Sequence, residues 1–255
     1  VAVSQAQLDQ LGAQAFAEAK AQTPQTRDPR QVAYVRCVVN DLVAVLPAEW
    51  RSTQWETAVF ADDQANAFAL PGGYVYVNRG ILERASNMSE LAGVMGHEIE
   101  HVVLRHSVKQ MEQQQGANVG LSIACALTNV CNSQITQAAV NVGATAVFAK
   151  FSRQDEVQAD DGGFQNVVRA GINPRGMLTF FQKLLAEEQS SGGSGNTASW
   201  FADHPGTQDR IADIQRMLNS MSAAQLAKLQ TDESAFQSMK RRLAQLPAAP
   251  KAPAQ

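Results

Sequence analysis

The motif H-E-x-x-H at residues 97–101 constrains this chain more than any other feature of its sequence. Residues four apart on an α-helix lie nearly in register, so the rings of His97 and His101 can both point at one metal ion. Glu98 would then lie beside the metal, where its carboxylate can take a proton from a zinc-bound water without ligating the ion. The motif therefore predicts a helix that presents a zinc site, with Glu98 as general base.

The neighbouring residues decide between a zinc helix and a surface helix that carries two solvated histidines. Residues 90–103 place apolar side chains at helical spacing, and Ser89 is the expected N-cap. A helix with this pattern is largely buried, and two buried histidines on it need a binding partner. The sequence thus favours the metal-binding interpretation.

A catalytic zinc ion has three protein ligands and an open position, so another ligand must lie elsewhere in the chain. His106 follows His101 by five residues, and a continued helix would turn its ring away from the metal face. The spacing also differs from that of the metzincins, whose third histidine lies six positions after the second. His204 is the only other histidine in the sequence, so a carboxylate is the favoured third ligand. Residues 152–160 (S-R-Q-D-E-V-Q-A-D) stand out as its source.

Four motifs in this order carry a family resemblance. They are N-A-F-A-L-P-G-G at 66–73, G-H-E-I-E-H at 96–101, S-R-x-x-E-x-x-A-D at 152–160, and D-H-P at 203–205 followed by Arg210. Together they resemble the HtpX and CAAX-prenyl-protease family of gluzincin zinc metallopeptidases, over roughly residues 30–220. The similarity is greatest to the soluble periplasmic branch of that family.

The resemblance implies that Glu156 is the third zinc ligand and that Asp160, one helical turn later, orients a ligand histidine. A metal-bound imidazole usually donates its other N–H to a carboxylate, which fixes its tautomer and ring angle. The alternative for both acids is a solvated charged face.

The resemblance also gives His204 a role near the metal. It implies that His204 either stabilises the oxyanion that develops during hydrolysis or reaches the metal and holds the enzyme latent. The alternative is a His-Pro pair at the start of a helix with no catalytic part. Arg210 is expected to brace this loop or to contact substrate carbonyls.

A substrate-binding role falls, by the same resemblance, to the strand that precedes the zinc helix. In gluzincins an edge strand beside the metal pairs with the substrate backbone, and the corresponding residues here are Asn66, Ala67, Phe68 and Ala69. Main-chain hydrogen bonds do not read side chains, so such pairing suits a protease with loose sequence preference. Without the resemblance, an ordinary hairpin would explain this region equally well.

The hydrophobic pattern predicts an α+β fold that is mainly α-helical, a gluzincin-type domain with a small β-sheet beside the zinc helix. Strands are expected at 56–60, 66–70 and 74–77. Helices are expected at 4–21, 31–45, 138–170, 175–188, 207–220 and 222–245, with a flexible Gly-Ser loop at 189–198. With 255 residues and a net charge of −3, the chain fits one metallopeptidase domain at 1–245 and a disordered Pro/Ala tail at 246–255.

An uncharged stretch at residues 113–149 separates the two zinc motifs. Membrane-bound relatives carry spans here, but Gln and Asn residues interrupt every window of about 20 residues that could cross a bilayer. We therefore expect two packed helices with a turn near residues 128–129, and surface contact with a membrane or partner stays an alternative. Cys125 and Cys131 could form a disulfide across this turn or remain reduced, while Cys37 is expected to be a free, buried thiol.

These features together predict a zinc-dependent endopeptidase with one Zn²⁺ per chain. By resemblance, its substrates are unfolded or misassembled proteins of the cell envelope. The competing hypothesis is a latent, zinc-containing chaperone or assembly factor with little proteolytic turnover. A purely structural zinc site is disfavoured, because three ligands leave one position open.

The sequence also bounds partners and location. A slightly acidic chain without basic runs does not attract phosphates, so nucleic acid is not an expected partner. Peripheral contact with a membrane or with an outer-membrane assembly partner stays open. The first residues carry no signal peptide, so we expect either a mature periplasmic or envelope-associated form, such as a processed protein or a lipoprotein, or a protein that stays inside the cell.

Overall fold

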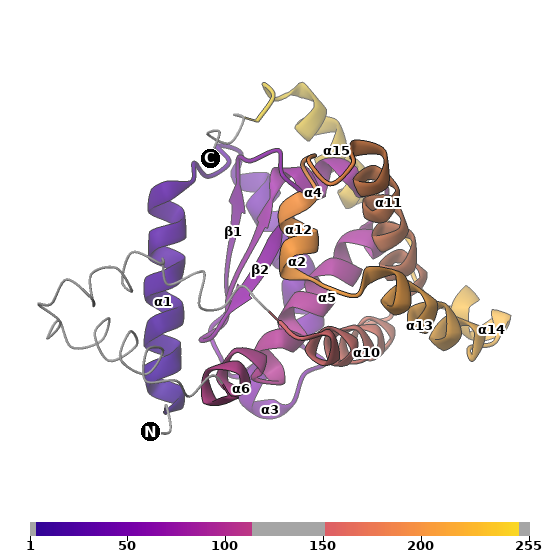
Figure 1. The fold of residues 1–255 in the computed structure, drawn as a ribbon. Helices are drawn as coiled ribbons and strands as arrows, with labels where there is room; N and C mark the ends of the chain where they lie inside the picture. The colour runs from indigo at the N-terminus through magenta and orange to yellow at the C-terminus, as the bar shows by residue number, and fades with distance from the viewer. Residues whose placement is uncertain (1–3, 114–150, 250–255) are drawn as a thin grey trace, which may run out of the picture.

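A three-stranded β-sheet lies between helix α1 and a larger group of helices (Figure 1). The computed structural model describes residues 4–113 and 151–249. Strands β1 (Glu56–Phe60), β2 (Ala67–Leu70) and β3 (Tyr74–Asn78) are arranged in the order β1-β3-β2. Strand β3 runs parallel to β1 and antiparallel to β2. The predicted strands are confirmed, although β2 begins one residue later and β3 ends one residue later than expected.

The two faces of the sheet pack against different helices, because side chains alternate along each strand. Ala67 and Ala69 belong to the larger core, together with side chains of α2 (Pro29–Val43) and α5 (Met88–Val103). Phe68 and Leu70 point to the opposite face, where α1 (Gln5–Gln22) packs against them. The sheet is therefore buried on both faces.

Helix α5 lies at the centre of the molecule and packs against the sheet on one side and against α10 and α11 on the other (Figure 1). The fold is thus mainly α-helical with a small sheet, as predicted. The remaining described helices are α3 (Ala48–Arg51), α4 (Arg79–Arg84), α6 (His106–Gln113), α10 (Arg153–Arg169), α11 (Arg175–Ser191), α12 (Ala198–Asp203), α13 (Thr207–Asn219), α14 (Ala223–Ala227) and α15 (Ser234–Gln245).

Helix α5 is buried along nearly its whole length, from Met88 to Val102. Its N-cap is Asn87 and not the predicted Ser89, because the Asn87 side chain accepts a hydrogen bond from the N–H of Glu90 at 3.1 Å. At the other end Arg105 has a φ of 55°, in the left-handed region that residues other than glycine rarely adopt. The chain therefore turns sharply there, and α6 begins at His106.

The helix that carries the second motif is shorter than predicted. Helix α10 begins at Arg153, because Ser152 caps it by accepting a hydrogen bond from the N–H of Asp155 at 3.1 Å. One continuous helix over 138–170 is therefore wrong at residues 151–152, and residues 138–150 lie outside the described part. Helix α11, in contrast, continues to Ser191 and ends at Gly192, so the predicted loop shortens to residues 192–197.

The predicted helix at 222–245 is wrong, since the structure divides it into α14 and α15. The residues between them contact the first turn of α5. The N–H of Ser89 donates to the Thr231 carbonyl at 2.9 Å, and the N–H of Met88 donates to the Asp232 carboxylate at 3.1 Å. A helix start has free N–H groups, so satisfying them keeps this segment extended.

In the described part of the chain, no helix is both long enough and apolar enough to cross a membrane. The predicted helix pair at 113–149 and the Cys125–Cys131 pairing lie outside that part, except that Gln113 ends α6. Cys37 has a free thiol, as predicted, but it is exposed on α2, so its expected burial is wrong. Residues 246–249 follow α15 without regular structure, and the rest of the predicted tail is outside the described residues.

Candidate metal centre

Helices α5 and α10 bring the two sequence motifs together. Their backbones approach closely at Gly163, where an added Cβ would lie 2.9 Å from the backbone nitrogen of His97. Gly163, which has no Cβ, therefore allows this close approach of the two helices. Residues of α5 and of the first two turns of α10 therefore face one another at the centre of the molecule, where they are buried.

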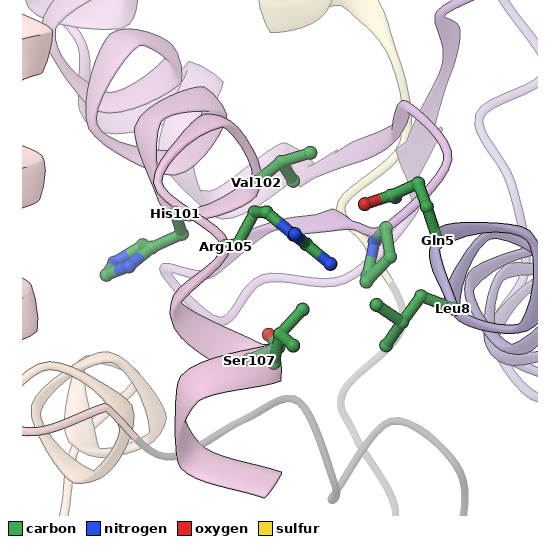
Figure 2. A pocket seen from close by; sticks show the side chains of 8 residues that line it. Gln5, Leu8, His101, Val102, Arg105 and Ser107 are labelled. Atoms are coloured by element: carbon green, nitrogen blue, oxygen red, sulfur yellow. The ribbon is translucent and has the colours of Figure 1, made fainter. Parts of the chain in front are cut away.

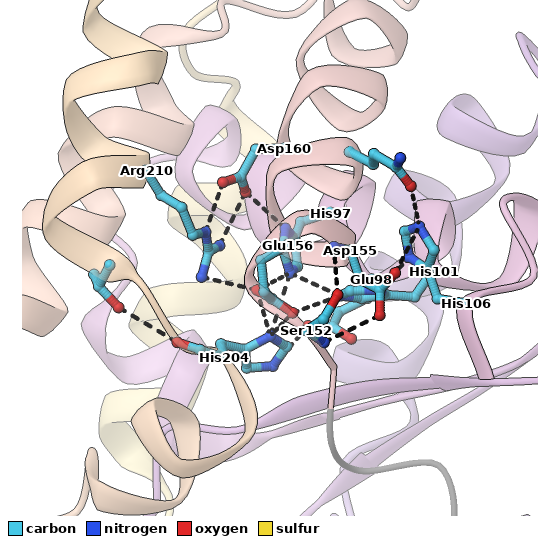
Figure 3. A network of polar contacts seen from close by, with 12 residues as sticks. His97, Glu98, His101, His106, Ser152, Asp155, Glu156, Asp160, His204 and Arg210 are labelled. Carbon is cyan, nitrogen blue, oxygen red and sulfur yellow. Dashed lines mark hydrogen bonds and ion pairs between the residues drawn. The ribbon is translucent and has the colours of Figure 1, made fainter. Parts of the chain in front are cut away.

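Four side chains converge on one point in this region: His97, His101, Glu156 and His204 (Figure 3). Nε2 of His97 lies 3.1 Å from Nε2 of His101 and 3.3 Å from Nδ1 of His204. The Glu156 carboxylate lies 3.2 Å from His97, 3.1 Å from His101 and 3.0 Å from His204. One ligand atom from each of the four residues lies within 4.8 Å of the other three.

These spacings fit a zinc ion. Four ligand atoms at about 2.0–2.1 Å from a tetrahedral zinc are about 3.3 Å from one another. The five pairs given above are 3.0–3.3 Å apart, and the remaining pair, His101 and His204, lies within 4.8 Å. Three imidazoles and one carboxylate are also ligands that zinc accepts. The four residues therefore fit a zinc site with His204 in the fourth position.

Behind His97 lies a carboxylate that fixes its ring. Nδ1 of His97 is 2.8 Å from Asp160, and Asp160 accepts hydrogen bonds from Arg210 at 2.6 and 2.9 Å. Another nitrogen of Arg210 lies 2.8 Å from Glu156. Arg210 is buried, so this position favours the bracing role considered for it over contact with substrate carbonyls.

The ring of His101 has a different neighbour. Its Nδ1 lies 2.9 Å from Nδ1 of His106, and Nε2 of His106 lies 2.9 Å from Oε1 of Gln158 (Figure 3). His106 is not among the four converging residues, as expected. The expectation that its ring turns away is wrong, because the helix breaks at Arg105. Sequence reasoning missed this contact, since nothing in the residue types indicates the break.

Glu98 and the aromatic residues complete the surroundings. Oε1 of Glu98 lies 3.3 Å from Nε2 of His204, on the side of that ring opposite the converging atoms. Trp200 stacks on His204 with ring centroids 4.0 Å apart, and Phe151 stacks on His101 at 3.7 Å. The sequence did not single out either aromatic residue. With these rings in place the four converging side chains are shielded from solvent.

Burial and neighbouring charges shift the pKa values of the cluster in opposite directions. Burial disfavours the His97 imidazolium, but Glu156 and Asp160 outweigh it and raise the pKa of His97 to about 10. At His101 burial dominates and lowers the pKa to about 3, which keeps the ring neutral. Burial also raises the pKa of Glu98 to about 8. A neutral imidazole is the form that binds zinc, so His101 is already in its ligating state.

The predicted substrate-binding strand, β2, is an edge strand of the described sheet. The Asn66 carbonyl accepts from the N–H of Asn78 at 2.9 Å, so Asn66 and then Phe68 face β3 with their main-chain groups. The main-chain groups of Ala67 and Ala69 consequently point to the other side. On that side the N–H of Ala67 donates a hydrogen bond to Oδ1 of Asn66 at 3.0 Å.

A small cavity lies where α1, the end of β2 and the corner between α5 and α6 meet (Figure 2). His101, Val102 and Arg105 line it from one side, and Gln5 and Leu8 of α1 from the other. Its volume of about 10 Å³ is enough for a single water. This cavity is therefore too small to hold a peptide substrate.

The fold and the converging residues define a gluzincin-type metallopeptidase domain. Helix α5 carries His97, His101 and the neighbouring Glu98. Helix α10 carries Glu156 and Asp160, the acid that contacts His97. The model of Peptidase family M48 matches residues 29–218, so the chain belongs to this family.

Several characterised proteins are similar to the chain. The Beta-barrel assembly-enhancing protease of Escherichia coli K12 is 30% identical over 219 residues, which cover 83% of this chain and 44% of the relative. Metalloprotease LoiP of the same strain is 30% identical, over 64% of this chain and 62% of the relative. The mitochondrial metalloendopeptidase OMA1 of Schizosaccharomyces pombe is 30% identical, over 72% of this chain and 52% of the relative. The chain thus spans less than half the length of the first of these relatives.

Proposed function

We propose that this chain is a zinc-dependent endopeptidase that hydrolyses peptide bonds without a covalent intermediate. The observation that carries the proposal is the convergence of His97, His101 and Glu156 on one point. Glu98 lies on the far side of the His204 ring, 3.3 Å from its Nε2. Membership of Peptidase family M48 supports the proposal. We assign the peptidase unit to residues 1–245 as a single domain, with residues 246–255 as a tail.

Each residue has a distinct part in this reaction. Zinc bound here would supply a Lewis acid that polarises the scissile carbonyl and lowers the pKa of a water. Glu98 removes the proton of that water and later returns it to the leaving amine. Asp160 accepts the Nδ1–H of His97 and so keeps Nε2 free to bind metal, while Arg210 holds both Asp160 and Glu156 in place.

His204 makes the observed arrangement a closed one. A catalytic zinc keeps one position open, and Nδ1 of His204 occupies the place of the fourth ligand. We therefore infer that this is a latent state and that His204 must leave before a substrate carbonyl can enter. In the open state the same imidazole would be the group that stabilises developing negative charge.

This closure also favours a second candidate function. A protein that rests in the latent state would bind partners and turn over little, as a zinc-containing chaperone or assembly factor would. The two candidates use the same residues and differ in how readily His204 leaves. Activity measurements therefore separate them.

Substrate would pair with the edge of β2 that faces away from β3. The main-chain groups of Ala67 and Ala69 point to that edge, where a substrate would have to displace the Asn66 side chain from the N–H of Ala67. The N–H of Ala65, which points the same way, donates to the carbonyl of Asn196 at 2.8 Å. Because Asn196 lies in the loop before α12, a peptide on this edge would lie next to the segment that carries His204.

The substrates we propose are unfolded or misassembled proteins of the cell envelope. One relative is named for enhancing the assembly of β-barrels, which supports a periplasmic or envelope-associated location and contact with membrane proteins during their assembly. Main-chain recognition by β2 suits unfolded chains of varied sequence.

Casein cleavage tests the proposal with four preparations: zinc-loaded wild type, Glu98→Gln, His204→Ala, and chelated wild type, each with its zinc content measured. We expect cleavage by wild type or His204→Ala, none by Glu98→Gln at full zinc occupancy, and none after chelation. Faster cleavage by His204→Ala would support latency. If no zinc-loaded form cleaves casein, the peptidase proposal is wrong and the chaperone candidate takes its place.

A further inference from the structure

We propose that His106 is a positioning residue for His101: it fixes the tautomer and the ring orientation of that ligand by accepting a hydrogen bond at Nδ1. This inference rests on the proposed zinc ligation by His101 and not on proteolytic turnover. His106 and Gln158 form a relay behind the metal site that ends in a side-chain amide. It differs in kind from the carboxylate that holds His97.

The geometry of the corner between α5 and α6 makes this contact. Arg105 adopts a φ of 55°, which redirects the chain so that His106, the first residue of α6, lies beside His101. The two Nδ1 atoms are 2.9 Å apart, a normal hydrogen-bond distance, and both rings are buried (Figure 3). Phe151 stacks on His101 with an interplanar angle of 10°, so the ring has little freedom to turn.

Proton placement along the relay follows from the ligand role of His101. Its Nε2 faces the other donors and must carry no proton when it binds metal, so the proton is on Nδ1. That N–H donates to Nδ1 of His106, which therefore has its own proton on Nε2. The Nε2–H of His106 donates in turn to the Gln158 oxygen at 2.9 Å. Each member thus has one defined hydrogen-bonding state.

Charge balance explains why an imidazole stands here in place of a second carboxylate. Glu156 and Asp160 are already buried carboxylates within the cluster, and Arg210 contacts both of them. A carboxylate at position 106 would add another buried negative charge, which is costly in a buried site. A neutral histidine accepts the hydrogen bond without adding charge. The Asp155 carboxylate lies 3.8 Å from Nε2 of His106, too far for a hydrogen bond.

Two substitutions at His106 separate positioning from packing. Leucine fills about the space of the imidazole but cannot accept a hydrogen bond. Asparagine is smaller, but its Oδ1 keeps an acceptor close to the position of Nδ1. If His106 only fills space, His106→Asn should weaken zinc binding more than His106→Leu does. If His106 acts as a hydrogen-bond acceptor, His106→Leu should weaken zinc binding more.

Zinc affinity by competition with a chelator, and the visible spectrum of the Co²⁺-substituted protein, give readouts that do not depend on activity. We expect His106→Leu to lose about 10- to 100-fold in zinc affinity with an altered Co²⁺ spectrum, and His106→Asn to stay close to wild type. Zinc affinity of His106→Leu equal to wild type, or weaker binding by His106→Asn than by His106→Leu, would overturn the inference.

Nitrogen NMR of the zinc-loaded wild type provides a test that needs no variant to fold. We expect His106 to carry its proton on Nε2, and a proton on Nδ1 would overturn the relay. A wild type that binds zinc but does not cleave casein would refute only the peptidase proposal. A wild type that binds no zinc would refute both.

Discussion

Replacing Gly163 with alanine should weaken zinc binding, because this glycine sets how closely α10 approaches α5. The added Cβ would lie 2.9 Å from the nitrogen of His97 and 3.0 and 3.1 Å from the carbonyl carbon and oxygen of Gly96. These are backbone atoms in the middle of a buried helix, so they cannot rotate away. Ordinary contacts are about 3.5–4.0 Å, so the helices must separate locally by about 0.5 Å.

That separation acts on the metal site, because the donors come from both helices. His97 and His101 lie on α5 and Glu156 lies on α10, while metal–ligand distances tolerate only about 0.2 Å. Overpacking typically costs about 1–3 kcal/mol. If this cost falls on the zinc-bound form, zinc affinity drops about 5- to 150-fold. The gain in helix propensity, about 1 kcal/mol, acts with and without zinc and cancels from the affinity.

The matched control is Gly162→Ala, one residue earlier on the same helix. Its Cβ would meet the carboxylate end of the Glu100 side chain, and a side-chain end can shift where backbone cannot. Competition titrations with a chromophoric chelator, together with urea unfolding of the zinc-free forms, compare the two variants. If Gly163→Ala binds zinc as tightly as wild type, or if Gly162→Ala weakens binding equally, close backbone packing does not set the ligand geometry.

Asp28 caps α2, and its carboxylate pairs with Arg242 at 2.8 Å. Burial disfavours the charged carboxylate, but the N–H of Arg30 and the guanidinium of Arg242 outweigh this effect and hold the pKa of Asp28 below 3.8. A lowered pKa stabilises the fold only while the carboxyl group is ionised. Asp28→Asn should therefore lower the free energy of unfolding by about 0.5 kcal/mol at pH 7, as measured by urea titration. The difference from wild type should disappear as the pH falls through the pKa of Asp28 in the folded protein. Arg105→Gly should keep or raise the Tm, and Arg105→Val should lower it, because a φ of 55° suits glycine and strains a β-branched residue; thermal melts check this. Chelation should lower the Tm by several degrees and added Zn²⁺ should restore it in calorimetry, because zinc binds the folded site preferentially.

Sequence reasoning succeeded where chemistry and periodicity agree. The H-E-x-x-H motif and its apolar surroundings predicted a buried helix, and α5 is buried along nearly its whole length. Glu156 and Asp160 came from a family motif and not from geometry, since sequence spacing cannot show that α10 packs on α5. The alternation of residues 56–77 predicted three strands, and all three form.

It failed where tertiary contacts override local preference. The extended residues between α14 and α15 hydrogen-bond to the start of α5, a partner more than a hundred residues away in sequence. The role of His106 depends on the left-handed conformation of Arg105, which residue type does not reveal. A continued helix was the expected outcome there, and it placed His106 on the wrong side of His101.

The four residues of the candidate zinc site lie on different elements, and this placement bears on the departure of His204 that we propose. His97 and His101 share one buried helix, and Glu156 is tied to Arg210 on α13. His204 instead lies between the six-residue helix α12 and Gly206, whose φ of 80° breaks the chain just before α13. In the opening that we propose, a rotation about Gly206 would carry His204 away with α12, and the buried Trp200 ring that stacks on His204 would leave the core with it. Because the Arg210 contacts to Glu156 and Asp160 lie beyond this hinge, the other three donors would keep their geometry, as a site that opens for substrate requires.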